Sequence, residues 1–234
     1  MLTFYYHPLS PISRRVWLAL LEKEISFESV VIDLPNREHM KPEFLELNPF
    51  HHIPVIEDGD FRLIESLAIL DYLELKYPQP ELVPSAADAI ALPRQSITHQ
   101  SLTRQLATMK MLQMVIVNEL MPKISKVIMM TEQPLSKALV DQLHQIMVFL
   151  DNHLEERPYF GGTNLNLADI VAGATIPLFQ RLGFSLEPYA ALGHWCQTIT
   201  SRPAWQATSP SDDELDAWQQ VLRRWIRVSQ KRRA

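Results

Sequence analysis

Two hydroxyl side chains near the N-terminus stand where a helix is expected to begin. Ser10 precedes Pro11, and proline is preferred at the first position of a helix, so Ser10 is expected to be the N-cap whose oxygen accepts a backbone N–H. The same position can stabilise an anion, because free N–H groups and the helix dipole both face it. Ser13 lies further into the helix and is expected to turn toward the backbone or solvent. The spacing alone leaves both uses of Ser10 open.

Glu65 and Ser66 place a carboxylate beside a hydroxyl at the expected junction of a hairpin and a helix. One interpretation is structural, with Ser66 capping its own helix. The other is a binding site, in which Glu65 takes an amine while Ser66 and the helix N-terminus take an anion. These two interpretations also remain open.

A proline-rich turn, Asn48–Pro54, offers main-chain groups for binding. The bond between Ile53 and Pro54 could be cis, although only about 5–6% of such bonds are. If it is cis, the N–H and C=O of Ile53 face outward and can pair with a peptide-like ligand. The alternative is an ordinary trans proline at the edge of a strand.

The segment Asn166-Leu167-Ala168-Asp169 has the pattern of a capping box, in which Asn166 and Asp169 cap each other's backbone. We expect it to serve folding and not catalysis. The single cysteine, Cys196, lies within an expected helix and is expected to be a buried, unreactive thiol. One cysteine can form neither an internal disulfide nor a cysteine zinc site nor a CxxC pair.

The N-terminal part of the chain alternates between strand-like and helix-like segments. Asp58-Gly59 between two apolar runs is a strong hairpin signal, and the helix after it is expected to stop at Pro78. The order βαβ followed by ββα is that of a compact α/β unit. Strands are expected at 2–6, 27–33, 54–56 and 61–64, and helices at 16–21 and 67–77.

Beyond the proline-rich segment 78–93, the periodic segments are helical. Residues 167–182 carry only Asp169 near the start and Arg181 near the end, so this helix is expected to lie buried inside a bundle. In 212–229 the acids come first and the bases last, as the helix dipole favours. Helices are expected at 96–126, with a kink at Pro122, and at 135–155, 167–182, 189–200 and 212–229.

The composition excludes several classes of protein. The 234 residues include 22 basic and 27 acidic ones, a formal net charge of −5, which argues against general binding to nucleic acid or to an anionic membrane. The N-terminus lacks the pattern of a signal peptide, and no run approaches the ~18 apolar residues of a membrane span, so a cytoplasmic protein is expected. The sequence also lacks a phosphate-binding loop, a GxSxG elbow and a pair of histidines at metal-ligand spacing.

Three motifs resemble the soluble glutathione transferases: HPLSPISRRVWLAL, EHMKPEFLELNPFHHIPVIEDGDFRLIESLAILDYL and NLNLADI. The resemblance covers essentially the whole chain and is closest to the serine-type theta and phi classes. It implies the fold of that family, an α+β thioredoxin-like domain over residues 1–80, a linker over 81–93 and an all-α helical domain over 94–234. It also implies a cytoplasmic homodimer that uses glutathione as co-substrate, with no other cofactor and no metal.

The resemblance implies a role for each matched position. Ser10 would donate a hydrogen bond to the glutathione sulfur, and the absence of cysteine there counts against thiol transfer through a mixed disulfide. Tyr5 and Tyr6 lie on the first strand, too early for the catalytic tyrosine of other classes, and are expected in the core. Glutathione would be bound by the main chain of Ile53 before a cis Pro54, by Glu65 at the γ-glutamyl amine, by Ser66 at the γ-glutamyl carboxylate, and by His39 and His52 near the glycine carboxylate.

The implied reaction is attack of the glutathione thiolate on an electrophilic carbon or a hydroperoxide oxygen, a detoxification, in an apolar pocket between the domains. The expected walls of that pocket are Leu9, Met111, Met114 and Val115. Trp218 and Trp225 of the last helix are expected to pack in the core, and the alternative is that they cover this pocket. Two alternatives remain, a non-catalytic ligand-binding or interaction protein on the same fold, and a glutathione-dependent isomerase or dehalogenase.

Overall fold

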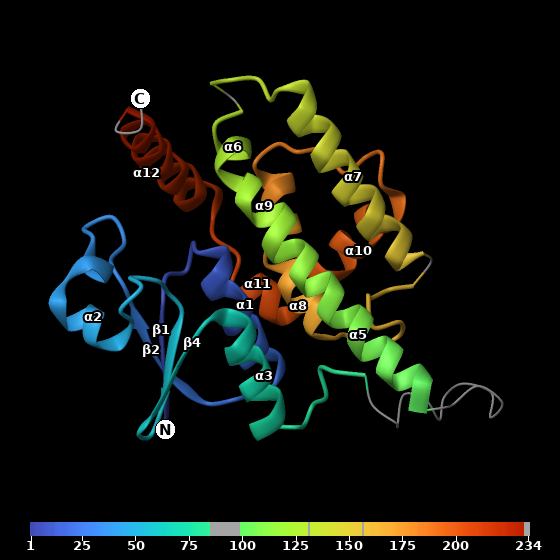
Figure 1. Cartoon of the computed structure of the whole chain (residues 1–234), viewed down its shortest axis with the longest axis horizontal. Coiled ribbons are helices and arrows are strands. Elements are labelled where there is room, and N and C mark those ends of the chain that lie inside the picture. Colours follow the sequence, from blue (N-terminus) through green and yellow to red (C-terminus); the bar gives the residue numbers. More distant parts are fainter. Residues whose placement is uncertain (85–98, 131, 156, 232–234) are drawn as a thin grey trace. The chain divides into compact units, whose positions relative to one another are not determined.

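The computed structural model describes residues 1–84, 99–130, 132–155 and 157–231. The chain divides into two compact units, one of residues 1–80 and 203–234 and the other of residues 81–202 (Figure 1). The C-terminal part of the chain, which we expected within one helical domain, therefore belongs with the first unit. Residues 85–93 of the expected linker lie outside the described residues.

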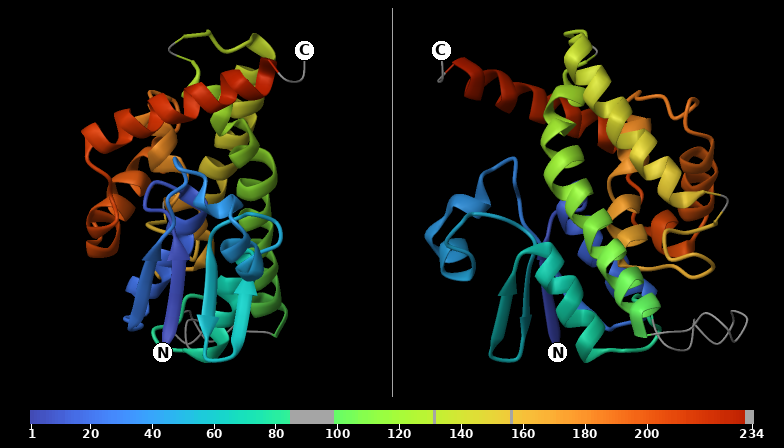
Figure 2. Two further views of the ribbon diagram at one scale, coloured as in Figure 1. Left: turned by 90° about the vertical axis from the view of Figure 1, so that its left-hand side faces the viewer. Right: turned by 45° about the vertical axis from the view of Figure 1, so that its right-hand side comes forward.

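A four-stranded sheet forms the centre of the first unit (Figure 2). The strand order is β2-β1-β3-β4, with β1 parallel to β2 and antiparallel to β3. The expected hairpin is confirmed, because β3 turns into β4 through Gly59, whose φ of +67° suits glycine. This order and these directions are those of a thioredoxin-like sheet. The strands are β1 (Leu2–Tyr6), β2 (Phe27–Val31), β3 (Val55–Asp58) and β4 (Phe61–Ile64).

Helices lie on both sides of this sheet (Figures 1 and 2). α1 (Pro11–Glu22) and α3 (Ser66–Lys76) contact each other on one side. α2 (Pro42–Leu47) lies on the other side, where its buried Phe44 belongs to the same apolar cluster as Val55 of β3. The sequence did not predict α2, because its single turn and a half is too short for a visible period.

The second unit consists of helices. The helix expected over 167–182 is in fact two helices, α8 and α9, which corrects the prediction. The break has a simple cause, since Pro177 has no N–H to bond to the carbonyl of Gly173 and so begins a new helix. The expected irregularity near Pro122 is confirmed, as a π-helical turn followed by a 3-10 turn. The elements are α5 (His99–Val115), η2 (Ile116–Leu120), η3 (Met121–Lys123), α6 (Ile124–Ile128), α7 (Lys137–Leu154), α8 (Leu167–Gly173), α9 (Ile176–Arg181) and α10 (Ala190–Thr200).

The capping box at the start of α8 is confirmed, and every residue of α8 is buried. Asn166 Oδ1 accepts from the N–H groups of Ala168 and Asp169 at 2.7 and 3.3 Å, and Asp169 Oδ2 accepts from Asn166 N at 2.9 Å. Asp169 Oδ1 also accepts from Phe160 N at 2.9 Å and from Trp195 Nε1 at 2.8 Å. Burial raises the pKa of Asp169 to about 6 despite these donors. One carboxylate thus joins α8, α10 and the loop before α8.

The chain ends with α11 (Pro203–Ala207) and α12 (Asp212–Lys231), both in the first unit. Arg14 of α1 holds α11, since its Nη2 donates to Trp205 O at 3.2 Å and its Nε donates to Thr208 Oγ1 at 3.1 Å. Among the described residues, no helix combines the length and the apolar character needed to cross a bilayer.

Candidate functional site

Ser10 is the N-cap of α1, and its backbone is extended, with φ −83° and ψ 115°. Its Oγ accepts a hydrogen bond from Ser13 N at 3.2 Å, so the predicted cap is confirmed. The cap occupies a lone pair of Oγ and leaves the hydroxyl hydrogen free to donate elsewhere. The two interpretations of Ser10 are therefore compatible, because one hydroxyl can cap the helix and donate to an anion at once.

Ser13 was expected to turn toward the backbone or solvent, and it is fully buried within α1, so the solvent alternative is wrong. Its Oγ has no hydrogen-bond partner within the described part of the chain. A hydroxyl enclosed in this way cannot contact a ligand without a change of structure. Ser10, which is partly exposed, is the only one of these two serines that a ligand can reach.

The structural interpretation of Glu65 and Ser66, in which Ser66 caps its own helix, is wrong. Glu65 is the N-cap of α3, at a φ of +70°, and Ser66 is the first helical residue. The Glu65 side chain makes no capping hydrogen bond and is exposed, so the N-terminus of α3 is left open to an anion. A non-glycine residue at positive φ is strained, and such strain is concentrated at functional sites.

Arg15 lies beneath this helix start, and the sequence analysis did not single it out. It is 2% exposed, and its Nη1 donates to Ser66 Oγ at 3.3 Å. Its Nε and Nη2 have no hydrogen-bond partner among the described residues. Burial lowers the pKa of Arg15 to about 10, which still leaves the guanidinium charged at neutral pH. A buried cation with unused donors, at the open start of a helix, favours binding of a carboxylate.

A signal for Arg15 was present in the sequence as two adjacent arginines in an otherwise apolar helix, Arg14 and Arg15. Arg14 uses its guanidinium within the protein, on Trp205 and Thr208. The sequence could not show which of the two arginines lies beneath Ser66, because that depends on how α1 packs against α3.

The remaining residues expected to bind glutathione lie around the turn before β3. The Ile53–Pro54 peptide bond is cis, and Ile53 lies just outside the strand register, which begins at Val55. His51 Nδ1 lies 3.2 Å from His39 O. Burial lowers the pKa of His39, and the charge of Arg37 and then those of His51 and His52 add to this effect. The structure therefore brings His39 and His52 together with His51, which the sequence analysis missed. Across the described residues, no cluster of side chains suits a metal ion.

The two tyrosines of β1 do not face this site as free hydroxyls. Tyr6 is buried in the core, as expected. Tyr5 donates its hydroxyl hydrogen to Glu57 Oε2 at 2.7 Å, and this bond is the largest cause that raises the pKa of Tyr5 to about 12. A phenol held by a carboxylate is a poor donor to a thiolate.

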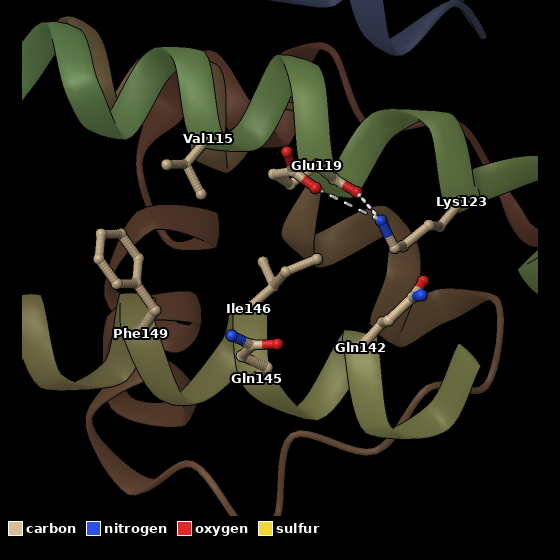
Figure 3. Close-up of a pocket in the computed structure, with 7 residues that line it drawn as sticks. All are labelled: Val115, Glu119, Lys123, Gln142, Gln145, Ile146 and Phe149. Atoms are coloured by element: carbon tan, nitrogen blue, oxygen red, sulfur yellow. Dashed lines mark hydrogen bonds and ion pairs between the residues drawn. The ribbon is translucent and has the colours of Figure 1, made fainter. Parts of the chain in front are cut away.

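A pocket of about 500 Å³ lies in the second unit, between the end of α5 with η2 and the middle of α7 (Figure 3). One end is apolar, with Val115, Ile146 and Phe149, and at the other end Lys123 Nζ lies 3.8 Å from Glu119 Oε2. Of the expected pocket walls, Val115 lines it. Met111 and Met114 are exposed on α5, and Leu9 is partly exposed in the loop before α1.

A thioredoxin-like unit followed by a helical unit is the architecture of the soluble glutathione transferases. Family descriptions agree with the fold: residues 4–81 match the glutathione S-transferase N-terminal domain and residues 108–203 match the C-terminal domain. The chain belongs to the glutathione S-transferase family and is a transferase.

Named relatives and solved structures extend this likeness over most of the chain. Glutathione S-transferase PARB of Nicotiana tabacum is 28% identical over 211 residues, which is 85% of this chain and 92% of that protein. Glutathione S-transferase F10 of Arabidopsis thaliana is 28% identical over 219 residues, 89% of this chain and 97% of that protein. A delta-class glutathione transferase of Nilaparvata lugens superposes with a TM-score of 0.76 at 25% identity, covering 95% of this chain and 98% of that structure. Glutathione transferase F7 of Populus trichocarpa has a TM-score of 0.71 at 24% identity, covering 89% and 98%.

Proposed function

We propose that the thiolate of glutathione attacks an electrophilic carbon, forming a thioether, or attacks a hydroperoxide oxygen, breaking the O–O bond and releasing the alcohol. We also propose that Ser10 stabilises this thiolate. The observation that carries the proposal is that an exposed carboxylate, Glu65, stands next to Ser66, whose hydroxyl accepts a hydrogen bond from the buried guanidinium of Arg15. A γ-glutamyl group has an amine and a carboxylate on one carbon. Glu65 would pair with the amine. The Ser66 hydroxyl and the first N–H groups of α3 would bind the carboxylate, and the positive charge of Arg15 would attract it.

The rest of the tripeptide would extend from this end along the turn before β3. The main-chain N–H and C=O of Ile53, before Pro54, would pair with the cysteinyl residue as a further strand partner does. His39 and His52 would contact the glycine carboxylate, with His51 close by. The carboxylates of the ligand are thus matched at both ends, and its thiol is directed to Ser10.

The chemical step requires a thiolate. A thiol with a pKa of about 8.5 is only a few per cent ionised at neutral pH. A hydrogen bond to a charged acceptor contributes about 1.5–3 kcal/mol, which lowers the pKa of the thiol by about one to two units. The free hydrogen of Ser10, at the positive end of α1, is sufficient for this. The thiolate then attacks the electrophile without a metal or a further cofactor.

The second substrate would be held by apolar side chains. Met111 and Met114 are exposed on α5, and flexible thioethers suit ligands of varied shape. We assign the electrophile to these two residues and to Val115 of the same helix. Loss of the Met114 side chain should raise the KM for an apolar electrophile and leave the KM for glutathione unchanged.

Titration calorimetry with glutathione tests the binding site. Glu65→Ala should weaken binding by about ten- to a hundredfold, because the ligand amine loses its charged partner. Asp60→Ala is the matched control, since it removes an exposed acid from the β3–β4 turn and should leave the affinity unchanged. Equal affinities of wild type and Glu65→Ala would place the γ-glutamyl site elsewhere.

We further propose that the protein acts as a homodimer in the cytoplasm. Support comes from an apolar patch on the first unit, formed by Phe61, Tyr72 and Leu75. The rings of Phe61 and Tyr72 lie 5.2 Å apart, and Leu75 is 83% exposed on the same face of α3. Burial of such a patch against a second copy removes apolar surface from water.

A further inference from the structure

One histidine holds the loop that ends at Ser10. His7 follows β1 directly and is only 8% exposed. Its Nδ1 accepts the N–H of Leu9 at 3.2 Å, and its main-chain oxygen accepts the N–H of Ser10 at 3.0 Å. Burial lowers the pKa of His7, against the opposing charge of Asp33, so the ring is neutral at neutral pH and Nδ1 can accept. The course of the chain from the end of β1 to Ser10 therefore depends on this side chain.

The C-terminal helix supports the His7 ring. The ring stacks on Trp218 of α12, with centroids 4.6 Å apart and an interplanar angle of 25°. Trp218 is itself buried and meets Trp225 edge to face at 5.9 Å. On the other side of Ser10, Arg14 is bonded to α11. Residues from the end of the chain thus contact the catalytic loop both before and after Ser10.

We propose that His7 is a positioning residue that aims the Ser10 hydroxyl, and that Trp218 holds it in place. The inference rests on the role of Ser10 proposed above. Ser10 Oγ already accepts from Ser13 N, so the direction of its free hydrogen is set by the path of the loop. The stacked His7 ring and its hydrogen bond to Leu9 N–H restrict the loop to one conformation. This matters because a small displacement of a catalytic group lowers the reaction rate.

A double-mutant cycle on His7 and Ser10 tests the inference, with the pKa of glutathione bound to each variant as the readout. His7→Phe keeps an aromatic ring on Trp218 and removes the acceptor for Leu9 N–H. With Ser10 present, it should raise the pKa of the bound thiol by about half a unit or more, as a weakened hydrogen bond does. In the Ser10→Ala background, His7→Phe should leave the pKa of the bound thiol unchanged, because His7 affects that pKa only by orienting the Ser10 hydroxyl.

Further variants separate positioning from general stability. His7→Asn restores an acceptor near the position of Nδ1 and should bring the pKa of the bound thiol part of the way back. Trp218→Ala should raise that pKa as His7→Phe does, whereas Trp225→Ala, on the same helix but without contact to His7, should not. The glutathione affinity of each variant, measured at a pH below the pKa of the bound thiol, should equal that of wild type, because the tripeptide is held by other residues.

Three results would overturn the inference: no effect of His7→Phe, the same effect in both Ser10 backgrounds, or Trp225→Ala acting as strongly as Trp218→Ala. Unfolding curves identify any variant that fails to fold. If His7→Phe fails, His7→Asn takes its place in the double-mutant cycle. If Ser10→Ala alone leaves the pKa of bound glutathione unchanged, the proposed role of Ser10 is wrong. If instead Ser10→Ala raises this pKa and His7→Phe does not, the role of Ser10 stands and only the role of His7 is wrong.

Discussion

Two neighbouring arginines of α1 are expected to respond to mutation in opposite ways. Arg15→Leu removes a buried cation whose Nε and Nη2 have no partner in the described structure. It should weaken glutathione binding by about ten- to a hundredfold, since the positive charge beneath Ser66, which attracts the γ-glutamyl carboxylate without contacting it, is lost. It should not lower the free energy of unfolding, because an apolar residue fits a buried site without desolvation of a charge.

Arg14→Leu is the matched control for this prediction. It breaks the bonds to Trp205 O and Thr208 Oγ1, so it should lower the free energy of unfolding while glutathione affinity is kept. Calorimetry and chemical denaturation of both variants give the comparison. If Arg15→Leu binds glutathione normally and is instead destabilised, Arg15 has a structural role only.

At the scale of the element, the start of α8 depends on Asp169. Its carboxylate accepts from Phe160, Asn166 and Trp195 in a fully buried place. Asp169→Ala leaves these donors without an acceptor, at about 1–3 kcal/mol each, and should lower the free energy of unfolding by roughly 3 kcal/mol or more. Denaturant titration followed by fluorescence measures this.

An exposed acid provides the comparison for Asp169. Asp141 of α7 meets Lys137 at the surface, and exposed pairs of this kind contribute about 0.5 kcal/mol or less. Asp141→Ala should therefore unfold almost as wild type does. If the two variants lose similar amounts of unfolding free energy, the capping box does not stabilise the second unit as inferred.

Elements with local signals could be predicted from the sequence. Ser10 before Pro11, Asp58-Gly59 between apolar runs, and Asn166 with Asp169 each act on neighbouring residues, so each is visible in a short segment. The break between α8 and α9 was also local, yet the apolar pattern across Pro177 hid it. The candidate site was predictable as far as it consists of helix starts and turns.

Features that depend on contacts between distant segments could not be predicted. Arg15 meets Ser66 only because α1 packs against α3. The stacking of His7 on Trp218 requires that the end of the chain return to the first unit. Neither residue type nor spacing predicts such a return, because the apolar side chains of α12 (Leu215, Trp218, Leu222 and Trp225) would pack on any apolar partner.

At the scale of the whole molecule, the proposed homodimer is tested by light scattering. The wild type should have a mass near twice the 27.0 kDa of one chain at micromolar concentration. Leu75→Lys places a charge in the apolar patch with Phe61 and Tyr72 and should shift the mass toward that of one chain. Val228→Lys changes an exposed apolar residue of α12 and should not. A wild-type mass of one chain would contradict the dimer.

The ultraviolet absorbance of the thiolate of bound glutathione, followed during a pH titration, measures whether Ser10 stabilises that thiolate. The measurement compares wild type, Ser10→Ala and Ser13→Ala, each checked for folding because the loss of the cap costs about 1 kcal/mol. Ser10→Ala should raise the pKa of the bound thiol by about one to two units, and Ser13→Ala should leave it where wild type has it. An unchanged pKa in Ser10→Ala, together with a raised one in Ser13→Ala, would show that Ser13 and not Ser10 stabilises the thiolate.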